Sequence, residues 1–420
     1  MRWPFLLLAL LASVPAEAQL RGHGGPVRAL ATSPQGAISG SFDQSAIIWS
    51  VEEGAARQVL RLHEGAVNAV AALGQDRYAT AGEDGRVALW RAGNAAPVRV
   101  VAAHRGPIVA LAVSNDGRRL ASASWDGTAG IVPVEGGEVL RLEGHQGNVN
   151  AVAFLPDGTL ATAGYDATLR LWRADGTPQR TITLPTALNA LVAAPDGALL
   201  AAGADGVVRE IAPDGSVRAL DGGEGGPVLA MAIAPDGARI AAAGLRRVQV
   251  LDRRTGRTAL ALSGPVLPVW SIAYRPDGSE ILTGGGDRVV RRWDARTGEP
   301  VGALAVAAAR PEAATAGDRR GAEVFRACAA CHALTPDEGN RAGPSLVGLF
   351  GRRIATGPNY AYSEALRRMD ITWTPQTVSE LFEVGPSRYT PGTKMPEQVI
   401  ADPEDRAALM RYLAEATTPR

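Results

Sequence analysis

The only two cysteines of the chain stand close together, in the run CAACH at residues 328–332. Cys328 and Cys331 are separated by two residues, and His332 follows directly. Two thiols at this spacing could form a disulfide, supply half of a zinc site, act as a redox dithiol or attach a haem. The rest of the chain must decide among these four chemistries.

Three of the four chemistries lack support elsewhere in the sequence. A zinc site needs four ligands, but there is no other cysteine, and the remaining four histidines belong to the repeats described below. A thioredoxin-like dithiol needs a βαβ context, and a helical pair so close together is rarely a structural disulfide. Cys-x-x-Cys-His is the attachment motif of c-type haem, so we predict one haem c bound covalently through Cys328 and Cys331.

The elements around this motif are predicted to be helical. In residues 317–332 (GDRRGAEVFRACAACH) the apolar side chains and Cys328 recur on one helix face. Two further helices are expected at 375–384 and 403–416, because Pro375 and Pro403 suit a first helical turn. These segments form a predicted domain over residues 317–420, preceded by an Ala-rich linker at 307–316.

A repeat of about 40 residues fills residues 19–306. Four copies begin at a histidine, and three further copies without it begin near residues 185, 225 and 266; the four are His23, His63, His104 and His145. Each copy has short alternating segments separated by turn signals such as PDG, NDG and EDG. Seven such copies predict an all-β, seven-bladed propeller.

The repeats resemble those of the WD-repeat family. That family's structural quartet is complete in the second copy as His63, Thr80, Asp84 and Trp90. The first and fourth copies also carry it, as His23, Ser39, Asp43 and Trp49, and as His145, Thr162, Asp166 and Trp172. The resemblance implies that each quartet hydrogen-bonds in series across its blade. The histidines are therefore assigned to structure, and the propeller is predicted to be a binding platform without a cofactor of its own.

Some copies depart from the family pattern. The third has Val132 where the tryptophan stands, and the sixth retains little beyond Leu251 and Asp252, so the sixth blade is the weakest prediction. Ring closure is also open, because residues 19–22 and 299–306 could each supply the outer strand of the seventh blade.

Residues 317–416 resemble the class I cytochromes c of the bacterial and mitochondrial-type branch. Besides CAACH, the resemblance rests on GPSLVGLFGRR at 343–353, NYAYSEALRRMDITW at 359–373 and PSRYTPGTKM at 386–395. These motifs occur in the family's order. The whole chain is therefore expected to be a multidomain protein, an all-β propeller followed by an all-α class I cytochrome c domain.

The cytochrome resemblance also implies roles for single residues. His332 and Met395 would be the axial ligands of the iron, and the carbonyl of Pro344 would accept the Nδ1–H of His332. Donors to a haem propionate are implied at Arg352, Tyr362 and Trp373.

The family comparison also separates Met395 from the other methionines. Met231, Met369 and Met410 are expected to be core residues. One departure concerns the methionine side of the site: Phe382 stands where mitochondrial-type relatives have a tyrosine near the methionine sulfur.

A His/Met-ligated iron has no open position for substrate, so we expect an electron carrier rather than an enzyme. In the expected function, one-electron transfer through haem c is combined with a propeller that docks a redox partner or a scaffold protein. The alternative is an oxidoreductase whose propeller binds a substrate or second cofactor and passes electrons to haem c. A redox or ligand sensor is a third possibility.

The composition bears on the partners of the protein, and the N-terminal sequence predicts its location in the cell. Basic and acidic residues both number 43, a balance that does not indicate nucleic acid or an anionic membrane as partner. Residues 1–18 are expected to be a signal peptide, since Arg2 precedes an apolar run and Ala16-Glu17-Ala18 forms a cleavage site. The run is too short to span a bilayer, and no later segment is apolar enough. We expect an exported, soluble protein of the periplasm.

Overall fold

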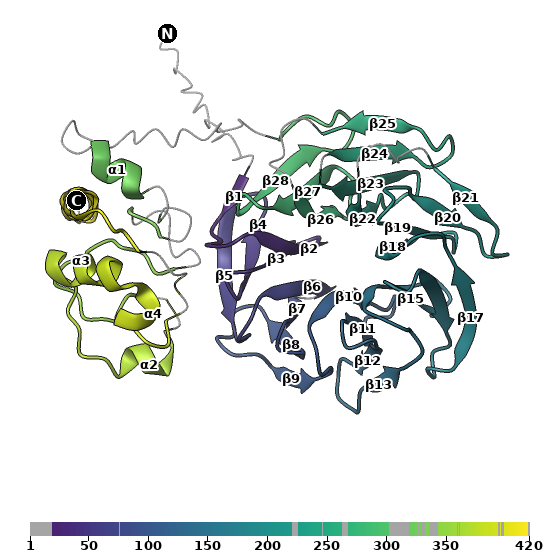
Figure 1. The fold of residues 1–420 in the computed structure, drawn as a ribbon, viewed down its shortest axis with the longest axis horizontal. Helices are drawn as coiled ribbons and strands as arrows, with labels where there is room; N and C mark the ends of the chain where they lie inside the picture. Colours follow the sequence, from purple (N-terminus) through teal and green to yellow (C-terminus); the bar gives the residue numbers. More distant parts are fainter. Residues whose placement is uncertain are drawn as a thin grey trace, which may run out of the picture.

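The computed structural model describes residues 19–74, 76–220, 226–245, 247–262, 268–301, 319–325, 328, 332–335, 343–358, 360, 362–393, 395 and 399–418. In this part of the chain, 28 strands and five helices form two domains (Figure 1). The strands build seven four-stranded sheets arranged around a centre, and the helices lie to one side. The structure therefore confirms a seven-bladed propeller followed by a helical domain.

Each blade runs from an inner to an outer strand. The innermost strands are β2 (Val27–Ser33), β6 (Val67–Gly74), β10 (Ile108–Val113), β14 (Val149–Phe154), β18 (Leu188–Ala193), β22 (Val228–Ile233) and β26 (Val269–Tyr274). The second strands are β3 (Gly36–Ser41), β7 (Arg77–Gly82), β11 (Arg119–Ser124), β15 (Leu160–Gly164), β19 (Leu199–Gly203), β23 (Arg239–Gly244) and β27 (Glu280–Gly285).

The remaining strands complete the blades toward the rim. The third strands are β4 (Ser45–Ser50), β8 (Arg86–Arg91), β12 (Ala129–Pro133), β16 (Thr168–Trp172), β20 (Arg209–Ile211), β24 (Val248–Asp252) and β28 (Val289–Asp294). The outer strands are β5 (Ala55–Arg61), β9 (Arg99–Ala102), β13 (Leu140–Leu142), β17 (Pro178–Thr183), β21 (Val217–Ala219), β25 (Thr258–Ala261) and β1 (Gln19–Arg21).

The N-terminal strand closes the ring. β1 pairs antiparallel with β28, and Leu20 faces Val290 in that register. The side chain of Leu20 is fully buried in the core between the first and seventh blades. Between residues 299 and 301 the structure has only an isolated bridge, from Pro300 to Trp293. Of the two candidate segments, the N-terminal one thus supplies the outer strand of the seventh blade.

Small residues let the blades pack closely. The second strands are almost fully buried and read GAISGS in β3 and LATAG in β15, whereas the outer strand β5 is mostly only partly buried. Apolar side chains of neighbouring blades then meet in shared clusters, as where Val87 of the second blade joins Leu120 and Val132 of the third. Burial of these side chains is the main stabilising term of the propeller.

The predicted hydrogen-bond series is present. In the second blade, His63 Nδ1 lies 3.0 Å from the Asp84 carboxylate and Nε2 lies 2.8 Å from Thr80 Oγ1. Thr80 Oγ1 also accepts the Trp90 indole N–H at 2.9 Å. The first and fourth blades repeat the series through Ser39 and Thr162. Each series satisfies polar groups that are buried between strands.

The incomplete copies build blades with part of the series. In the third blade, His104 bonds Ser122 at 2.8 Å and the indole position is filled by the buried Val132. In the seventh, the indole N–H of Trp293 donates to Thr283 at 2.9 Å, although the histidine is missing. The sixth blade, which keeps least of the pattern, still forms its four strands. Strand alternation is therefore sufficient for a blade.

The C-terminal domain is built from α1 (Arg319–Phe325), α2 (Glu364–Arg367), α3 (Pro375–Val384), α4 (Pro386–Tyr389) and α5 (Pro403–Ala416). α3 and α5 have the predicted bounds, with Thr374 and Asp402 as N-caps before the two prolines. The short helices α2 and α4 were not expected from the sequence. Gly321 allows α1 to cross α5 closely, because a Cβ there would stand 2.6 Å from Tyr412 Cβ.

Two sequence expectations bear on the ends of this domain and on the membrane. The predicted helix start at residue 317 and the linker at 307–316 lie outside the described residues. Over the part of the chain that the structure describes, none of the helices has the length and apolar character that crossing a membrane would require.

Candidate functional site

Two backbone hydrogen bonds link α1, Cys328 and His332. The Cys328 N–H donates to the carbonyl of Phe325 at 2.8 Å, and the His332 N–H donates to the carbonyl of Cys328 at 3.0 Å. The second bond has the four-residue spacing of an α-helical hydrogen bond, a spacing that brings the side chains of Cys328 and His332 to one side. Cys331 lies outside the described residues.

The Cys328 side chain is buried against the apolar core of the domain. Burial raises the pKa of its thiol to about 12, so the sulfur is protonated at neutral pH. Among the described residues, no group of three His, Cys, Asp or Glu side chains is placed to hold a metal ion. A neutral thiol in apolar surroundings is a poor zinc ligand, and it fits a covalent attachment point better.

A backbone carbonyl orients the imidazole of His332. Its Nδ1 lies 2.8 Å from the carbonyl oxygen of Pro344, which can only accept a hydrogen bond. Nδ1 therefore carries the proton, and in the neutral ring Nε2 is the nitrogen with a lone pair. This is the tautomer that a metal-ligating histidine needs, with the second nitrogen held by the protein.

Gly343 provides the space for that ring. A Cβ at this position would stand 2.5 Å from Cε1 and 2.8 Å from Nδ1 of His332, closer than atoms approach in real structures. Glycine is thus required by the position of the imidazole. Gly343 is the first residue of the motif at 343–353, but its role could not be predicted from the sequence, because the clash depends on a tertiary contact.

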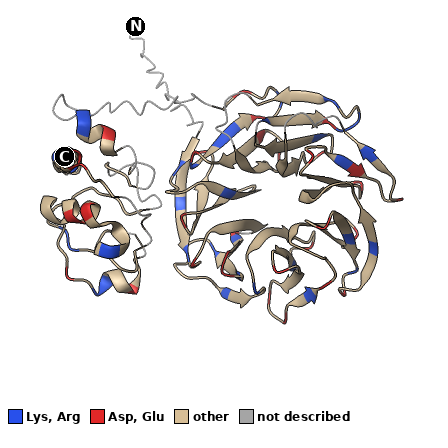
Figure 2. Cartoon of the chain, in the orientation of Figure 1, with Lys and Arg blue, Asp and Glu red and all other residues tan. Residues whose placement is uncertain are grey.

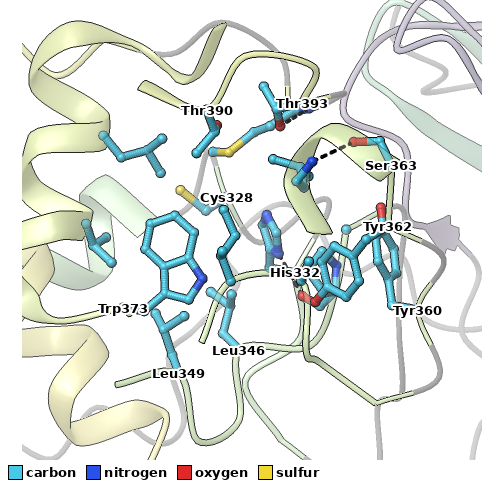
Figure 3. Close-up of a pocket in the computed structure, with 18 of the residues that line it drawn as sticks. Cys328, His332, Leu346, Leu349, Tyr360, Tyr362, Ser363, Trp373, Thr390 and Thr393 are labelled. Atoms are coloured by element: carbon cyan, nitrogen blue, oxygen red, sulfur yellow. Dashed lines mark hydrogen bonds between the residues drawn. The ribbon is translucent and has the colours of Figure 1, made fainter. Parts of the chain in front are cut away.

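His332, Cys328 and Met395 line a single cavity of about 510 Å³ (Figure 3). Most of its other walls are apolar side chains of the helical domain: Phe325, Leu346, Leu349, Ile354, Leu366, Val378, Leu381, Phe382 and Leu413. A cavity of this size and character is typical of a cofactor site. The structure therefore brings together a buried thiol, an oriented imidazole and a thioether around one space.

The residues that were expected near a propionate also line this cavity. The backbone of Trp373 pairs with the neighbouring loop, since its N–H donates to the carbonyl of Arg352 at 2.9 Å. The Arg352 guanidinium donates to the carbonyls of Val347 at 3.0 Å and Ser345 at 2.9 Å. Arg352 thus supports the loop after Pro344 as well as contributing to the cavity wall.

The third residue of this group, Tyr362, lies in a partly apolar setting. Burial raises the pKa of its phenol, and the positive charge of Arg352 opposes that rise in part. In Figure 3, Trp373 stands on one side of the cavity and Tyr362 on the other, beside Tyr360. The polar edges of both rings are therefore available at one cavity.

Other side chains in the cavity wall were not singled out in advance. Tyr360, Ser363, Thr390 and Thr393 line it together with the expected residues. All four belong to the motif runs quoted above, so their neighbourhood was indicated by the sequence, but their direction was not. Phe382 also lines the cavity and is buried.

The other methionines among the described residues do not line the cavity. Met231 and Met410 are buried in apolar clusters of the propeller and of the helical domain, as expected. Met369 is only partly buried, so its assignment to the core is wrong. Its position in the loop between α2 and α3, which lies partly in solvent, explains the difference.

Two family descriptions match the two domains. The description "WD domain, G-beta repeat" matches residues 16–50, 54–91, 95–131, 136–173 and 257–294. The description "Cytochrome c" matches residues 319–417, which contain the whole candidate site. Sheets also form in the fifth and sixth blades, whose strands β18 to β24 lie outside these repeat matches.

Curated relatives match the C-terminal domain over nearly their whole length. Cytochrome c of Cannabis sativa is 37% identical over 107 residues, which are 25% of this chain and 96% of the relative. Cytochrome c of Chlamydomonas reinhardtii is 42% identical over 106 residues, 25% of this chain and 94% of the relative. Cytochrome c of Arabidopsis thaliana is 41% identical over 100 residues, 24% of this chain and 88% of the relative.

A solved structure resembles the N-terminal domain. The WD40 β-propeller domain of Doa1 superposes with a TM-score of 0.60 and 23% sequence identity. The match covers 66% of this chain and 96% of that domain. At this level of identity the likeness supports the fold of the propeller and carries nothing about its partner.

Proposed function

Because the chain belongs to the cytochrome c family through its C-terminal domain, we propose that it carries single electrons on a haem c. The group would be attached through Cys328 and Cys331 and ligated by His332 and Met395. The observation that carries this proposal is the cavity in which a buried thiol, an oriented imidazole and a thioether meet. When bound there, haem c supplies one-electron oxidation and reduction of its iron.

The protein's own residues orient the proposed ligand and line the site with apolar side chains. Pro344 fixes the tautomer of His332, and Gly343 keeps room for its ring. The apolar side chains of the cavity exclude water, which keeps the reorganisation that accompanies a change of charge small. If both His332 and Met395 held the iron of a bound haem, they would leave no position for a substrate, and outer-sphere electron transfer would be the favoured chemistry.

The propeller would serve as a docking platform for a protein partner. Four large side chains stand exposed at the same turn of their blades, directly after the second strand: Phe42, Trp125, Tyr165 and Leu245. Because all second strands end on one side of the ring, these residues mark one face. Exposed apolar side chains that recur on a single face are typical of protein interaction sites.

Charge gives the platform little directional preference. Basic and acidic residues are interspersed over both domains in Figure 2, in keeping with the equal totals of the chain. We therefore propose a partner held mainly by aromatic contacts rather than by long-range steering.

Export to the periplasm is part of the proposal and rests on the N-terminal sequence alone. Arg2, the apolar run after it and Ala16-Glu17-Ala18 support a cleaved leader. Cell fractionation of the host should place the chain in the periplasm with Gln19 at its N-terminus. A cytoplasmic, uncleaved chain would contradict this part of the proposal.

The experiment that tests the function combines haem quantification with a redox titration of the purified full chain. We expect one covalent haem per chain, a reversible one-electron transition, and no second chromophore in the optical spectrum. A second iron, or an organic cofactor released on denaturation, would favour an oxidoreductase whose propeller binds substrate. A chain without covalent haem would contradict the proposal.

A further inference from the structure

The wall of the cavity includes residues of the propeller. Asp43, Arg61, Leu62 and Ala95 line it together with the residues of the helical domain. Arg61 ends β5, the outer strand of the first blade, and Figure 1 shows β5 on the side of the propeller that faces the helices. The first blade therefore completes one side of the candidate haem site.

The Arg61 side chain reaches across the domain boundary. Its guanidinium carbon lies 5.7 Å from the centre of the Tyr360 ring, at the distance of a cation–π contact. Tyr360 in turn packs edge-on against Tyr362, with ring centres 4.8 Å apart. The Nε and Nη1 atoms of Arg61 are shielded from solvent. A partly buried cation of the propeller thus stands beside the tyrosine pair of the cavity.

The carboxylate of the first blade that lines the cavity, Asp43, is held by hydrogen bonds within its own blade. Asp43 accepts hydrogen bonds from the Gly24 N–H at 2.7 Å and from Ser45 Oγ at 2.6 Å, and it lies 3.0 Å from His23 Nδ1. This network fixes Asp43 at the cavity edge. Burial alone would raise the pKa of Asp43, but His23, Ser45 and the positive charge of Arg61 lower it, and the net pKa lies below the ordinary value.

The chemistry of the proposed ligand matches this cation. Haem carries two propionate carboxylates on one edge, and carboxylates in a largely apolar cavity need charged or hydrogen-bonding partners. Among the described residues that line the cavity, the arginine and lysine side chains are those of Arg61 and Arg352. Arg352 already donates to two carbonyls of its own loop, and its positive charge acts on Tyr362, the ring neighbour of Tyr360.

We propose that Arg61 binds a haem propionate across the domain boundary, so that the propeller supplies part of the haem site. The inference rests on the haem proposed above and adds a residue from outside the cytochrome domain. Arginine suits the role because its planar guanidinium binds a carboxylate and stacks on an aromatic ring at the same time. The Tyr360 ring provides that stacking surface.

The contact would couple the propeller to the redox equilibrium. Reduction adds one negative charge to the site, so a nearby, partly buried cation stabilises the reduced form. Removing the charge of Arg61 should shift the equilibrium toward the oxidised form on the order of tenfold at a fixed applied potential. Any partner that pulled the first blade away from the helices would have the same effect.

The test uses the full chain loaded with haem. Arg61→Ala and Arg61→Gln remove the charge, and Arg61→Lys keeps it without the planar fork. Arg57→Ala is the matched control, because Arg57 lies on the same strand and is exposed. For each variant we would measure haem content, the midpoint potential, and the propionate bending band in the resonance Raman spectrum.

We expect Arg61→Ala and Arg61→Gln to lower the potential and shift the propionate band, Arg61→Lys to retain part of both, and Arg57→Ala to match the unchanged chain. Two charge-removing variants are included so that a folding defect in one does not decide the result. A haem-loaded Arg61→Gln chain with the original potential and band would overturn this inference and leave the proposed function standing. If the unchanged chain never acquired haem, that result would instead overturn the proposed function.

Discussion

In the propeller, His63 has both ring nitrogens hydrogen-bonded inside one blade, whereas His332 of the helical domain bonds a backbone carbonyl and turns its ring to a cavity. His63 Nδ1 faces Asp84 and Nε2 faces Thr80, with the ring almost fully buried. His332 Nδ1 is held by Pro344. The partner types differ accordingly: a carboxylate and a hydroxyl in the first case, a carbonyl in the second.

The difference shows why a histidine count alone does not find a site. A carboxylate and a hydroxyl on opposite nitrogens complete a hydrogen-bond series, so the ring serves to hold three strands together. A carbonyl that accepts from Nδ1 fixes one tautomer of the ring. The lone pair of Nε2 can then bind a ligand in the cavity. The repeat position of the first four histidines was therefore informative, because it assigned them to the series.

The largest effect is expected when one histidine of each kind is replaced, which tests whether their roles differ. His332→Ala should abolish the normal haem absorption spectrum and the reversible redox transition, because the imidazole is the proposed ligand on that face. His145→Ala should leave both intact and lower the free energy of unfolding of the propeller by about 1–3 kcal/mol, since Asp166 and Thr162 lose a buried partner. Optical redox titration and denaturant unfolding measure the two effects.

The opposite pattern would overturn the comparison. If His145→Ala changed the haem spectrum while the propeller kept its stability, the histidine of the fourth blade would be part of a redox site. His23→Ala and His63→Ala serve as matched controls, because their blades carry the same complete series.

The second prediction tests Met395 as the second proposed ligand of the haem iron. Met395→Ala should lower the midpoint potential, because the thioether favours ferrous iron, and should abolish the weak near-infrared band of sulfur bound to ferric haem. Imidazole or cyanide should then bind readily. Met231→Ala, Met369→Ala and Met410→Ala should keep the band, and a band lost in one of these three instead would show that the ligand assignment is wrong.

Much of this architecture could be predicted from the sequence because it is encoded locally. A period of about 40 residues with turn signals specifies blades one at a time, and Pro375 and Pro403 mark helix starts within one turn. Ring closure could not be predicted, since a strand of three residues, Gln19–Arg21, is too short to have a readable alternation. Only its pairing with β28 and the burial of Leu20 decide the question.

The candidate site divides in the same way. Four residues could be predicted because they lie in motifs that occur in a recognisable order along the chain: Cys328, His332, Pro344 and Met395. The structure places all four at one cavity. Gly343 and Arg61 escaped prediction, because their roles depend on contacts with residues distant from them or in another domain. In the sequence Arg61 is one arginine among many in a repeat.

A smaller effect is expected from filling the space beside His332. Gly343→Ala puts a Cβ 2.5–2.9 Å from three ring atoms, so the imidazole must move and its bond to Pro344 must weaken. We expect a loss of about 1–3 kcal/mol in unfolding free energy and a shifted haem spectrum. Gly286→Ala in the propeller is the control, since its Cβ would meet only Pro268 at 3.8 Å. Equal behaviour of both variants would contradict a special role for Gly343.

The smallest effect concerns the pH dependence of stability that two of the blade histidines cause. Burial lowers the pKa of His104 and of His145 below the ordinary value of 6.5, so the folded blades keep these rings neutral. Below pH 6.5 the unfolded chain binds protons that the folded chain does not, so stability falls as the pH falls. Between pH 7 and 6 each ring should contribute less than about 1 kcal/mol to that loss. Unfolding of the propeller, followed by tryptophan fluorescence, should show this slope, and His104→Gln combined with His145→Gln should flatten it at a lower overall stability. If the double variant kept the full slope, the acid sensitivity would have to come from other groups, and the blade histidines would not be held neutral by burial.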